Sequence, residues 1–294
     1  MVTYDKGFGA RLFDKLNIFL MILVVVATFY PFYYVTIVSL SDGKAVLRGD
    51  VSLFPIGANL ETYEVVFRTP SIPRALASSV LYTTVGTLIN LVMTALCAYP
   101  LSRPRFSGRR FYIWVVTLTM FFSGGLIPLY LLILQLGLRN SIWALVLPVA
   151  ISPWNMFMMR TYFQGLPEEI FDAAKIDGAD ELQTLLRVAL PLAKPIFATL
   201  LLFYAVAHWN TWLHPLIFLD DKAKFPIQLV LRSVVLAGRM EAGREVAHPS
   251  HEAMVVEQGL KYATIMVSTI PILVVYPFVQ KYFVKGVMIG AIKG

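Results

Sequence analysis

Residues 167–191 read PEEIFDAAKIDGADELQTLLRVALP and lie between two long apolar segments. Pro167 suits the first turn of a helix, where its missing N–H costs nothing. The acidic Glu168 and Glu169 that follow favour the positive end of a helix dipole. The stretch is too polar to cross a bilayer and predicts a short helix that begins at its first residues.

Glycine at position 178 is expected to end this first helix, because glycine adopts the left-handed conformation at little cost. A second helix is expected to begin at Asp180, where Gln183 completes an approximate capping box. The apolar sides of the two helices comprise Ile170, Phe171, Ala173, Ala174 and Ile176, then Leu182, Leu185, Leu186 and Ala189. Periodicity alone leaves two interpretations open: an amphipathic connector at a membrane surface, or a helix that enters a groove of another protein.

The composition indicates a membrane protein. Hydrophobic residues make up 57% of the 294 residues and charged residues only 15%, whereas a soluble domain is about 25% charged. The net charge of +7 is spread over the chain without a Lys/Arg block, so it indicates membrane topology rather than nucleic-acid binding. The single cysteine, Cys97, lies in an apolar run and is expected to be a core residue.

Six stretches approach the roughly 20 apolar residues needed to cross a bilayer. None of them contains Asp, Glu, Lys or Arg, so the charges are confined to connections and ends. The sequence therefore predicts an all-α polytopic membrane protein with six transmembrane helices. The expected spans are 17–40, 77–101, 112–135, 141–159, 196–219 and 262–280.

The distribution of arginine predicts the orientation. The connection after the second span carries Arg103, Arg105, Arg109 and Arg110, whereas the next connection carries only Arg139. The positive-inside rule places the arginine-rich connection in the cytoplasm. Both termini and the stretch 167–191 then lie in the cytoplasm as well, and the long connections 41–76 and 220–261 face outward.

Polar side chains inside a bilayer usually face a bundle interior or a cavity. Amide side chains beside indole rings suit sugars, which present hydroxyls and an apolar face. The alternatives are that these residues join helices to one another, or that the tryptophans form an interfacial belt. The candidates for a substrate pathway are Asn90, Asn155, His208, Trp209, Asn210, Trp212 and His214.

Several other functions are disfavoured by missing motifs. The sequence has no P-loop, so the chain is not expected to bind ATP, and ATP and Mg²⁺ belong on another polypeptide. No Asp or Glu lies in an expected span, which counts against a secondary carrier or channel driven by an ion gradient. No metal-ligand cluster and no nucleophile–base pair supports a metal site or an intramembrane enzyme.

The stretch 167–191 also resembles the EAA motif of ABC importer permeases. That motif is Glu-Ala-Ala, three residues, Gly, nine residues, then Ile-x-Leu-Pro. The matching residues here are Asp172, Ala173, Ala174 and Gly178, followed by Val188, Leu190 and Pro191. The spacing is kept, with Asp for Glu and Val for Ile. The tail through Lys293 and Gly294, together with the segment from Trp209 to Leu216, is similar to the carbohydrate-importer branch.

The resemblance implies a type I ABC importer permease fold with a cytoplasmic coupling helix between helices 4 and 5. Residues 1–16 would form a cytoplasmic N-terminus, 17–285 one permease domain and 286–294 a cytoplasmic tail that reaches between the ATPases. The implied partners are a second permease in a heterodimer, two ATP-binding subunits and an extracytoplasmic solute-binding protein. The candidates for the ATPase contact are Glu168, Glu169, Asp172, Ala173, Ala174, Asp177, Gly178, Leu190, Pro191, Lys293 and Gly294.

The resemblance further implies location in a bacterial inner membrane and a carbohydrate cargo. The branch includes permeases for maltose-like oligosaccharides, whose smaller permease this chain resembles, and permeases for larger polysaccharide products. The overall sequence resembles the second group more, and this group includes the second permease of alginate importers. The absence of Lys and Arg from the spans leaves His208, His214 or a partner subunit to meet the charge of an acidic cargo.

Overall fold

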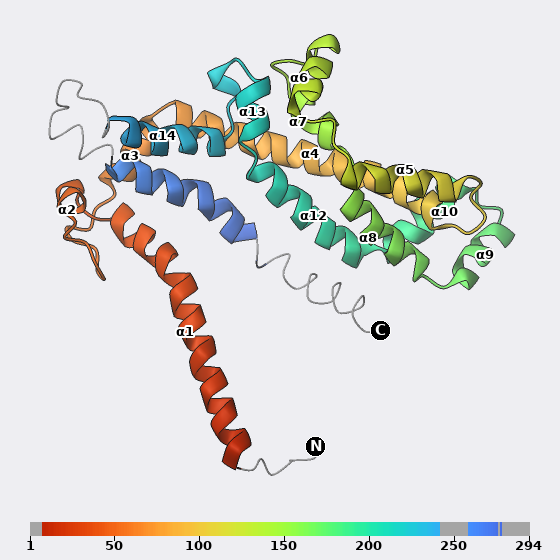
Figure 1. Cartoon of the computed structure of the whole chain (residues 1–294), viewed down its shortest axis with the longest axis horizontal. Coiled ribbons are helices and arrows are strands. Elements are labelled where there is room, and N and C mark those ends of the chain that lie inside the picture. Colours follow the sequence, from red (N-terminus) through yellow and green to blue (C-terminus); the bar gives the residue numbers. More distant parts are fainter. Residues whose placement is uncertain (1–7, 242–257, 276, 278–294) are drawn as a thin grey trace. The chain divides into compact units, whose positions relative to one another are not determined.

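The computed structural model describes residues 8–241, 258–275 and 277, and these residues form helices and turns without a strand. Figure 1 follows the helices in order along the chain. Their bounds are α1 Phe8–Ser39, α2 Gly43–Arg48, α3 Glu61–Arg68, α4 Ser71–Ser102, α5 Arg109–Phe121, α6 Leu126–Gln135, α7 Trp143–Val146, α8 Pro153–Gln164, α9 Glu168–Ile176, α10 Glu181–Thr184, α11 Leu190–Leu192, α12 Lys194–Trp209, α13 Leu213–Phe218 and α14 Ile227–Glu241. A further helix covers Gln258–Val275.

The chain divides into two compact units, the first of which comprises residues 1–69 and 233–268. From Leu12 to Phe32, its helix α1 has apolar side chains exposed on every side, as expected for a helix surrounded by lipid. The hydroxyl of Ser39 at the end of α1 lies 2.7 Å from the hydroxyl of Tyr63 in α3. The buried cluster between α1 and α2 comprises Ile37, Val38, Ala45 and Val51.

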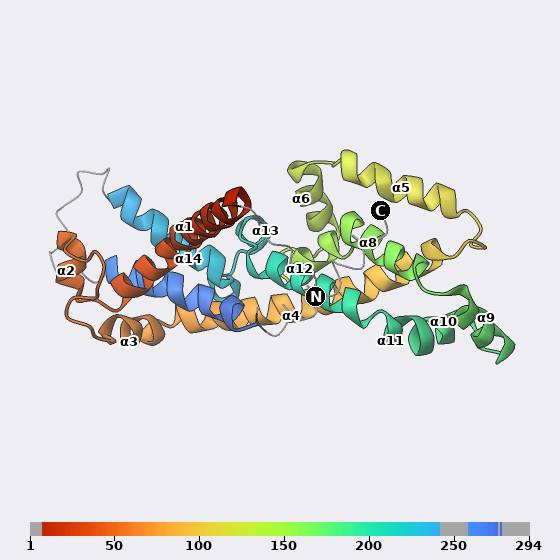
Figure 2. The ribbon, with the colours of Figure 1, turned by 90° about the horizontal axis from the view of Figure 1, so that it is seen from below.

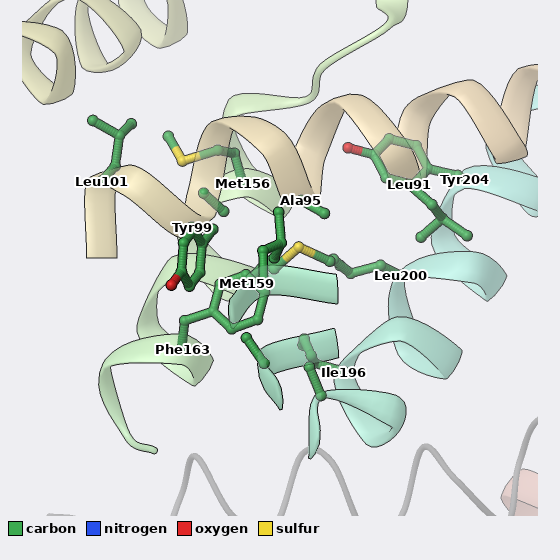
Figure 3. Close-up of a cluster of buried hydrophobic side chains, with 14 of the residues drawn as sticks. Leu91, Ala95, Tyr99, Leu101, Met156, Met159, Phe163, Ile196, Leu200 and Tyr204 are labelled. Atoms are coloured by element: carbon green, nitrogen blue, oxygen red, sulfur yellow. The ribbon is translucent and has the colours of Figure 1, made fainter. Parts of the chain in front are cut away.

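The second unit comprises residues 70–232 and 269–294. Within it, α4, α8 and α12 lie side by side in both views (Figures 1 and 2). Helix α8 begins where the Ser152 side chain accepts a hydrogen bond from the Asn155 N–H, with Pro153 in the first helical position. The shared core of the three helices includes Leu91, Ala95, Tyr99, Met156, Met159, Phe163, Ile196, Leu200 and Tyr204 (Figure 3).

Three of the described helices are long and apolar enough to cross a membrane: α1, α4 and Gln258–Val275. They overlap the first, second and sixth expected spans, although residues 276 and 278–280 of the sixth lie outside the described residues. Two bent pairs would raise the number to five if each were one span, namely α5 with α6 and Glu181–Leu192 with α12. The all-helical class is confirmed, while the count of six spans stays a prediction.

Three expected spans are not single straight helices, and the last of them, 196–219, is divided between α12 and α13. The span 112–135 is divided between α5 and α6, and the chain bends by 116° from one helix to the other across residues 122–125. The span 141–159 is divided among α7, a 3₁₀ turn at Leu147–Val149 and α8. Prolines at 148 and 153 lack the N–H needed to continue a helix, so the apolar run contains a break that hydropathy does not register.

Candidate coupling surface and translocation cavity

The helix α9 ends in a Schellman motif. The N–H of Gly178 donates to the Lys175 carbonyl and the N–H of Ala179 to the Ala174 carbonyl, both at 3.0 Å. Gly178 has φ of 77°. An added Cβ there would meet nothing within 4 Å, so backbone conformation, and not space, requires glycine. The predicted end of the first helix at this glycine is confirmed.

The second helix begins with the predicted capping box. The Gln183 N–H donates to Oδ1 of Asp180 at 2.7 Å, and the Asp180 N–H donates to Oε1 of Gln183 at 3.3 Å. Helix α10 then passes through one π-helical turn, Leu185–Ala189, into α11. We call residues 167–191, which form these two helices and their turn, the coupling segment.

A buried aromatic side chain fixes the first helix of the coupling segment. Phe171 in α9 is only 1% exposed. Its ring centroid lies 6.5 Å from that of Tyr99, which itself meets Phe163 edge-on at 5.8 Å. The guanidinium carbon of Arg103 lies 3.5 Å from the Phe171 centroid, a cation–π geometry. Two residues at the end of α4, Tyr99 and Arg103, therefore contact this anchor.

The same end of α4 also contacts the second helix of the coupling segment. The hydroxyl of Tyr99 donates to Oε2 of Glu181 at 3.0 Å. Oε1 of Glu181 lies 3.9 Å from Nζ of Lys175 in α9. One turn of α4 thus contacts both helices of the coupling segment, which are also tied to each other.

The outer face of the coupling segment remains open. Ala174 is 8% exposed and turns inward, whereas its neighbour Ala173 is exposed. Leu190 is half-buried, and Lys293 and Gly294 lie outside the described residues. The other predicted contact residues are all exposed: Glu168, Glu169, Asp172, Asp177, Gly178 and Pro191.

The predicted apolar stripe of the second helix is only partly correct. Leu185 and Ala189 are buried, but Leu182 and Leu186 are 57% and 53% exposed. Leu185 and Ala189 thus share a buried face, whereas Leu182 and Leu186, also four residues apart, share an exposed one. Ile176 of the first helix is 86% exposed. These three exposed apolar side chains lie on an otherwise polar surface. Apolar side chains are typical of the core of a protein–protein interface.

A cavity of about 540 Å³ separates the coupling segment from the loop after α4. Its walls carry charges of both signs, with Arg103 and Arg105 on the loop side and acids on the other. The charged residues contributed by the coupling segment are Glu168, Asp172, Lys175 and Glu181. A charged partner could therefore contact both the cavity wall and the exposed face of the coupling segment.

A second cavity, of about 410 Å³, lies among α4, α8, α12 and the turn before α8. Its lining brings together four of the predicted pathway residues that are far apart in sequence: Asn90, Asn155, His208 and His214. Tyr204 and Thr211 add hydroxyl groups to the same wall. The cavity therefore offers uncharged hydrogen-bonding groups within a largely apolar enclosure. We call it the central cavity.

Asn90 and His208 form a buried polar pair in the central cavity. Nε2 of His208 lies 2.6 Å from Oδ1 of Asn90, whose Nδ2 donates to the Val149 carbonyl at 2.5 Å. The histidine ring packs against Gly86, where a Cβ would lie 2.5 Å from ring atoms of His208. Glycine is therefore required at this position by space. The pair joins α4, α12 and the turn before α8.

Tyr204 makes a second polar junction one helical turn away from His208. Its hydroxyl lies 2.7 Å from Oγ1 of Thr94 and accepts a hydrogen bond from the Ser152 N–H at 3.2 Å. The hydroxyl thus joins α4, α12 and the N-cap residue of α8. Within the described part of the chain, no three His, Cys, Asp or Glu residues are grouped so that they could hold a metal ion.

The three remaining predicted pathway residues, Trp209, Asn210 and Trp212, separate into two groups. Asn210, Trp212 and His214 line a small cavity of about 160 Å³, which shares Thr211 and His214 with the central cavity. Trp209 is 6% exposed and lines neither cavity. Five of the six residues from 209 to 214 thus line one small cavity, whereas Trp209 is buried outside it.

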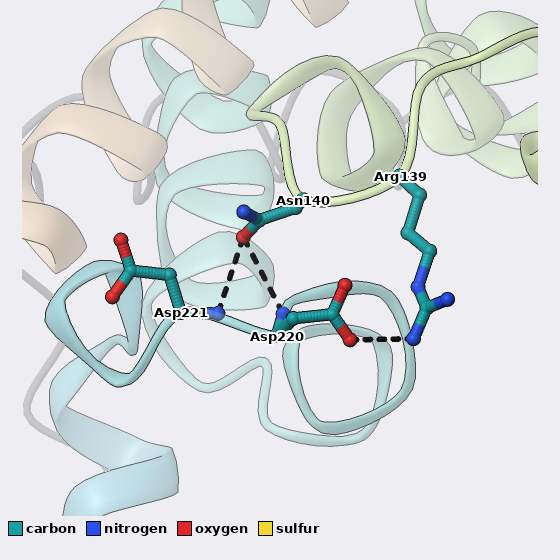
Figure 4. Close-up of polar contacts among 4 residues, drawn as sticks. All are labelled: Arg139, Asn140, Asp220 and Asp221. Atoms are coloured by element: carbon teal, nitrogen blue, oxygen red, sulfur yellow. Dashed lines mark hydrogen bonds and ion pairs between the residues drawn. The ribbon is translucent and has the colours of Figure 1, made fainter.

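The two connections that follow α6 and α13 are tied together (Figure 4). Nη2 of Arg139 lies 2.6 Å from Oδ1 of Asp220. Oδ1 of Asn140 accepts from the N–H groups of Asp220 and Asp221, and the Asn140 carbonyl accepts from Nζ of Lys224. This arrangement holds the segment after α13 against the turn before α7.

Sequence reasoning missed Gly86, Thr94 and Tyr204, although a signal was present. Gly86, Asn90 and Thr94 are spaced by four residues, as are Tyr204 and His208, so each set shares one helix face. The anchor of the coupling segment was also missed, because nothing local indicates that Phe171 would meet Tyr99 and Arg103. That contact depends on residues some 70 positions apart.

Comparison with known proteins gives consistent results along the whole chain. A model of the family described as binding-protein-dependent transport system inner membrane component matches residues 7–289. Protein LplC of Bacillus subtilis (strain 168) is 42% identical over 292 residues, covering 99% of this chain and 98% of that protein. The polygalacturonan/rhamnogalacturonan transport system permease protein YtcP of the same organism is 38% identical over 284 residues, covering 97% and 99%.

A solved structure is similar over nearly the same length. It is a chain of a bacterial ABC transporter involved in the import of the acidic polysaccharide alginate. The TM-score is 0.87 at 31% sequence identity, and the match covers 96% of this chain and 100% of that chain. Both sequence and fold therefore match the same class of protein.

Proposed function

Because the chain belongs to the family of binding-protein-dependent transport system inner membrane components, we propose that it moves acidic oligosaccharides through the central cavity. It is a permease subunit of an ABC importer for carbohydrate, and a partner ATPase hydrolyses the ATP. Its partners in such an importer are a second permease, ATPase subunits and a solute-binding protein.

The proposed topology has six spans with both termini in the cytoplasm. The absence of charged residues from the six stretches supports the count, and the arginine-rich loop after α4 supports the orientation. The breaks in α5–α6, α7–α8 and α12–α13 are compatible with spanning, because neighbouring helices can satisfy the freed backbone groups. The coupling segment then lies between the fourth and fifth spans on the cytoplasmic side.

We propose that the coupling segment is the contact with the ATPase. The observation that carries this proposal is that one side of the coupling segment is anchored and the other is exposed. Phe171 and Glu181 bind it to the end of α4, while Asp172, Ala173 and Gly178 stay exposed. A segment held on one side and open on the other can transmit a push from a partner, whereas a plain connector needs no such anchor.

Helix α4 would carry that push to the cargo. Tyr99 contacts the coupling segment and Asn90 lines the central cavity, and both belong to α4. They are nine positions apart along the helix, which is about 14 Å. Movement of the coupling segment would therefore displace the Asn90–His208 pair. ATP could shift the cavity between inward and outward states only through different affinities of the ATPase for those states.

Two neighbouring alanines provide a direct test of the coupling contact. Ala173 is exposed and Ala174 is 8% exposed. In a background where Cys97 is serine, Ala173→Cys should form a crosslink to the ATPase subunit of the intact importer, and Ala174→Cys should not. Equal crosslinking of both positions, or none at either, would contradict the proposed face.

The acidic cargo is inferred from the relatives and from the cavity wall. The names of YtcP and of the alginate importer give polymers of uronic acids as cargo. The central cavity presents amide, imidazole and hydroxyl groups, which suit sugar hydroxyls. Its uncharged wall lets a charged chain pass without binding it too tightly to leave.

Uptake by the complete importer tests the cargo. Proteoliposomes that contain both permeases and the ATPases, with the binding protein outside, should take up tetragalacturonate only when ATP is inside. A secondary carrier would instead take up cargo without ATP and stop when an ionophore removes the ion gradient. Uptake of maltotetraose in preference to tetragalacturonate would refute the acidic class but leave carbohydrate import intact.

A further inference from the structure

Arg232 and Trp212 form a stacked pair beside the small cavity next to the central cavity. The guanidinium carbon of Arg232 in α14 lies 3.7 Å from the centroid of the Trp212 ring. At that distance the two planar groups are in contact, which favours a cation–π arrangement. The pair lies within the second unit, at the segment that lines the 160 Å³ cavity.

The first turn of α14 is fixed so that Arg232 faces this segment. The N–H of Ile227 donates to the Ser79 hydroxyl of α4 at 2.8 Å, and Ile227 is fully buried. Nε2 of Gln228 lies 3.5 Å from Oδ1 of Asn210. Gln228 and Arg232 are four residues apart and share one helix face, so this face of α14 contacts both Asn210 and Trp212.

The charge of Arg232 is not neutralised by an acidic side chain within the described part of the chain. The side chain is exposed and has no carboxylate partner among the described residues. Stacking on an indole occupies the face of the guanidinium and leaves the N–H groups at its edge available. Those groups match a carboxylate in a two-pronged geometry that lysine cannot reproduce.

We propose that Arg232, held on Trp212, binds the carboxylates of a uronic-acid oligosaccharide where it enters the cavity. This rests on the proposed function and adds the group that recognises the charge. The small cavity shares Thr211 and His214 with the central cavity, so a sugar bound at Arg232 adjoins the proposed route. The expected spans lack Lys and Arg, and Arg232 meets the need for a cation from just outside them.

The test compares an acidic cargo with its neutral counterpart in the complete importer. The probes are tetragalacturonate and the same tetrasaccharide after reduction of its carboxyl groups. For Arg232→Gln, the concentration of tetragalacturonate that gives half-maximal uptake should rise about tenfold. Arg232→Lys should give an intermediate rise. Arg68→Gln, which removes an exposed arginine from another connection, should leave that concentration unchanged.

A second measurement separates cargo recognition from docking of the binding protein. Stimulation of ATP hydrolysis by cargo-loaded binding protein should require the same binding-protein concentration in the wild type and in Arg232→Gln. A higher required concentration would mean that Arg232 contacts that protein, and would overturn the inference. Unchanged tetragalacturonate uptake in Arg232→Gln, or an equal loss for both sugars, would also overturn it. Wild-type protein that imports neither sugar would instead refute the proposed function.

Discussion

The guanidinium of Arg103 lies on the ring of Phe171, with 3.5 Å between its central carbon and the ring centroid. Arg103 follows the last residue of α4, and Phe171 is the buried anchor of α9. Tyr99, one turn earlier, donates a hydrogen bond to Glu181 of the second coupling helix. The end of one helix therefore holds both helices of the coupling segment, which makes it the mechanical link in the proposed transport cycle.

Replacing Arg103 should weaken this link. Arg103→Gln removes a cation–π contact worth about 0.5–2 kcal/mol. We expect the amount of sugar imported per ATP hydrolysed to fall about threefold or more. Arg110→Gln is the matched control, because Arg110 is exposed and lies in the same arginine-rich region. This substitution removes the same charge as Arg103→Gln. An equal effect of both variants would attribute the loss to the charge of the region rather than to the Phe171 contact.

The turn of the coupling segment should tolerate residues according to their backbone preference. Gly178 has φ of 77° and open space around its Cβ position. Gly178→Asn should retain most uptake, because asparagine enters the left-handed region readily. Gly178→Ala should cost about 1–2 kcal/mol in the turn and reduce uptake. Gly178→Pro should abolish uptake, since proline fixes φ near −65° and lacks the N–H that donates to the Lys175 carbonyl.

The same series distinguishes conformation from contact. All three variants should still be inserted in the membrane at wild-type levels, as measured by blotting of membrane fractions. If Gly178→Asn failed as completely as Gly178→Pro, the requirement would come from close approach of the partner ATPase to the glycine, and the conformational explanation would be wrong.

Sequence reasoning succeeded where the signal is local. Gly178 and the Asp180–Gln183 capping box were predicted because a turn residue and a cap act on their own neighbours. The charge-free stretches likewise follow from the cost of placing charge in lipid. Each of these features depends on a few consecutive residues.

Sequence reasoning failed where partners come from distant parts of the chain. The stretch 141–159 is apolar enough to span a membrane, but hydropathy does not show whether the chain continues straight. The structure divides the stretch at Pro148 and Pro153. Trp209 has the same chemistry as Trp212, yet it is buried beside the cavity rather than lining it. The anchor at Phe171 depends on Tyr99 and Arg103, which no local pattern connects to it.

Asn140 should matter more than the ion pair beside it. It has φ of 58°, and its side chain accepts from two backbone N–H groups of the segment after α13. Asn140→Ala should lower the thermal stability of the purified importer. Asn140→Gly should lower it less, because glycine keeps the left-handed conformation. A greater loss for glycine than for alanine would contradict this assignment.

Disrupting the ion pair between Arg139 and Asp220 should have a small effect. Both side chains are about half exposed, and such pairs contribute about 1 kcal/mol or less. Arg139→Gln should therefore shift the melting temperature less than Asn140→Ala does. The shift should vanish in about 1 M salt, which screens exposed charges. A shift that persists in high salt would show that Arg139 acts through packing.

The contact between Gly86 and His208 predicts a strong effect of a single methyl group. A Cβ at position 86 would lie 2.5 Å from Cε1 and Nε2 of His208, so the ring must move. Its hydrogen bond to Asn90 would then be lost inside the central cavity. We expect Gly86→Ala to reduce uptake about tenfold or more, since an unpaired buried polar group costs about 1–3 kcal/mol. Gly124→Ala is the control, because its Cβ would meet nothing within 4 Å.

A double-mutant cycle shows whether the effect passes through the histidine ring. In a His208→Ala background the ring is absent, so adding Gly86→Ala should cause little further loss of uptake. The two changes should therefore be strongly non-additive, as expected for residues in direct contact. Additive losses would mean that the methyl group disturbs the packing of α4 against α12 in another way. The Asn90–His208 pair would then not be the part of the wall on which transport depends.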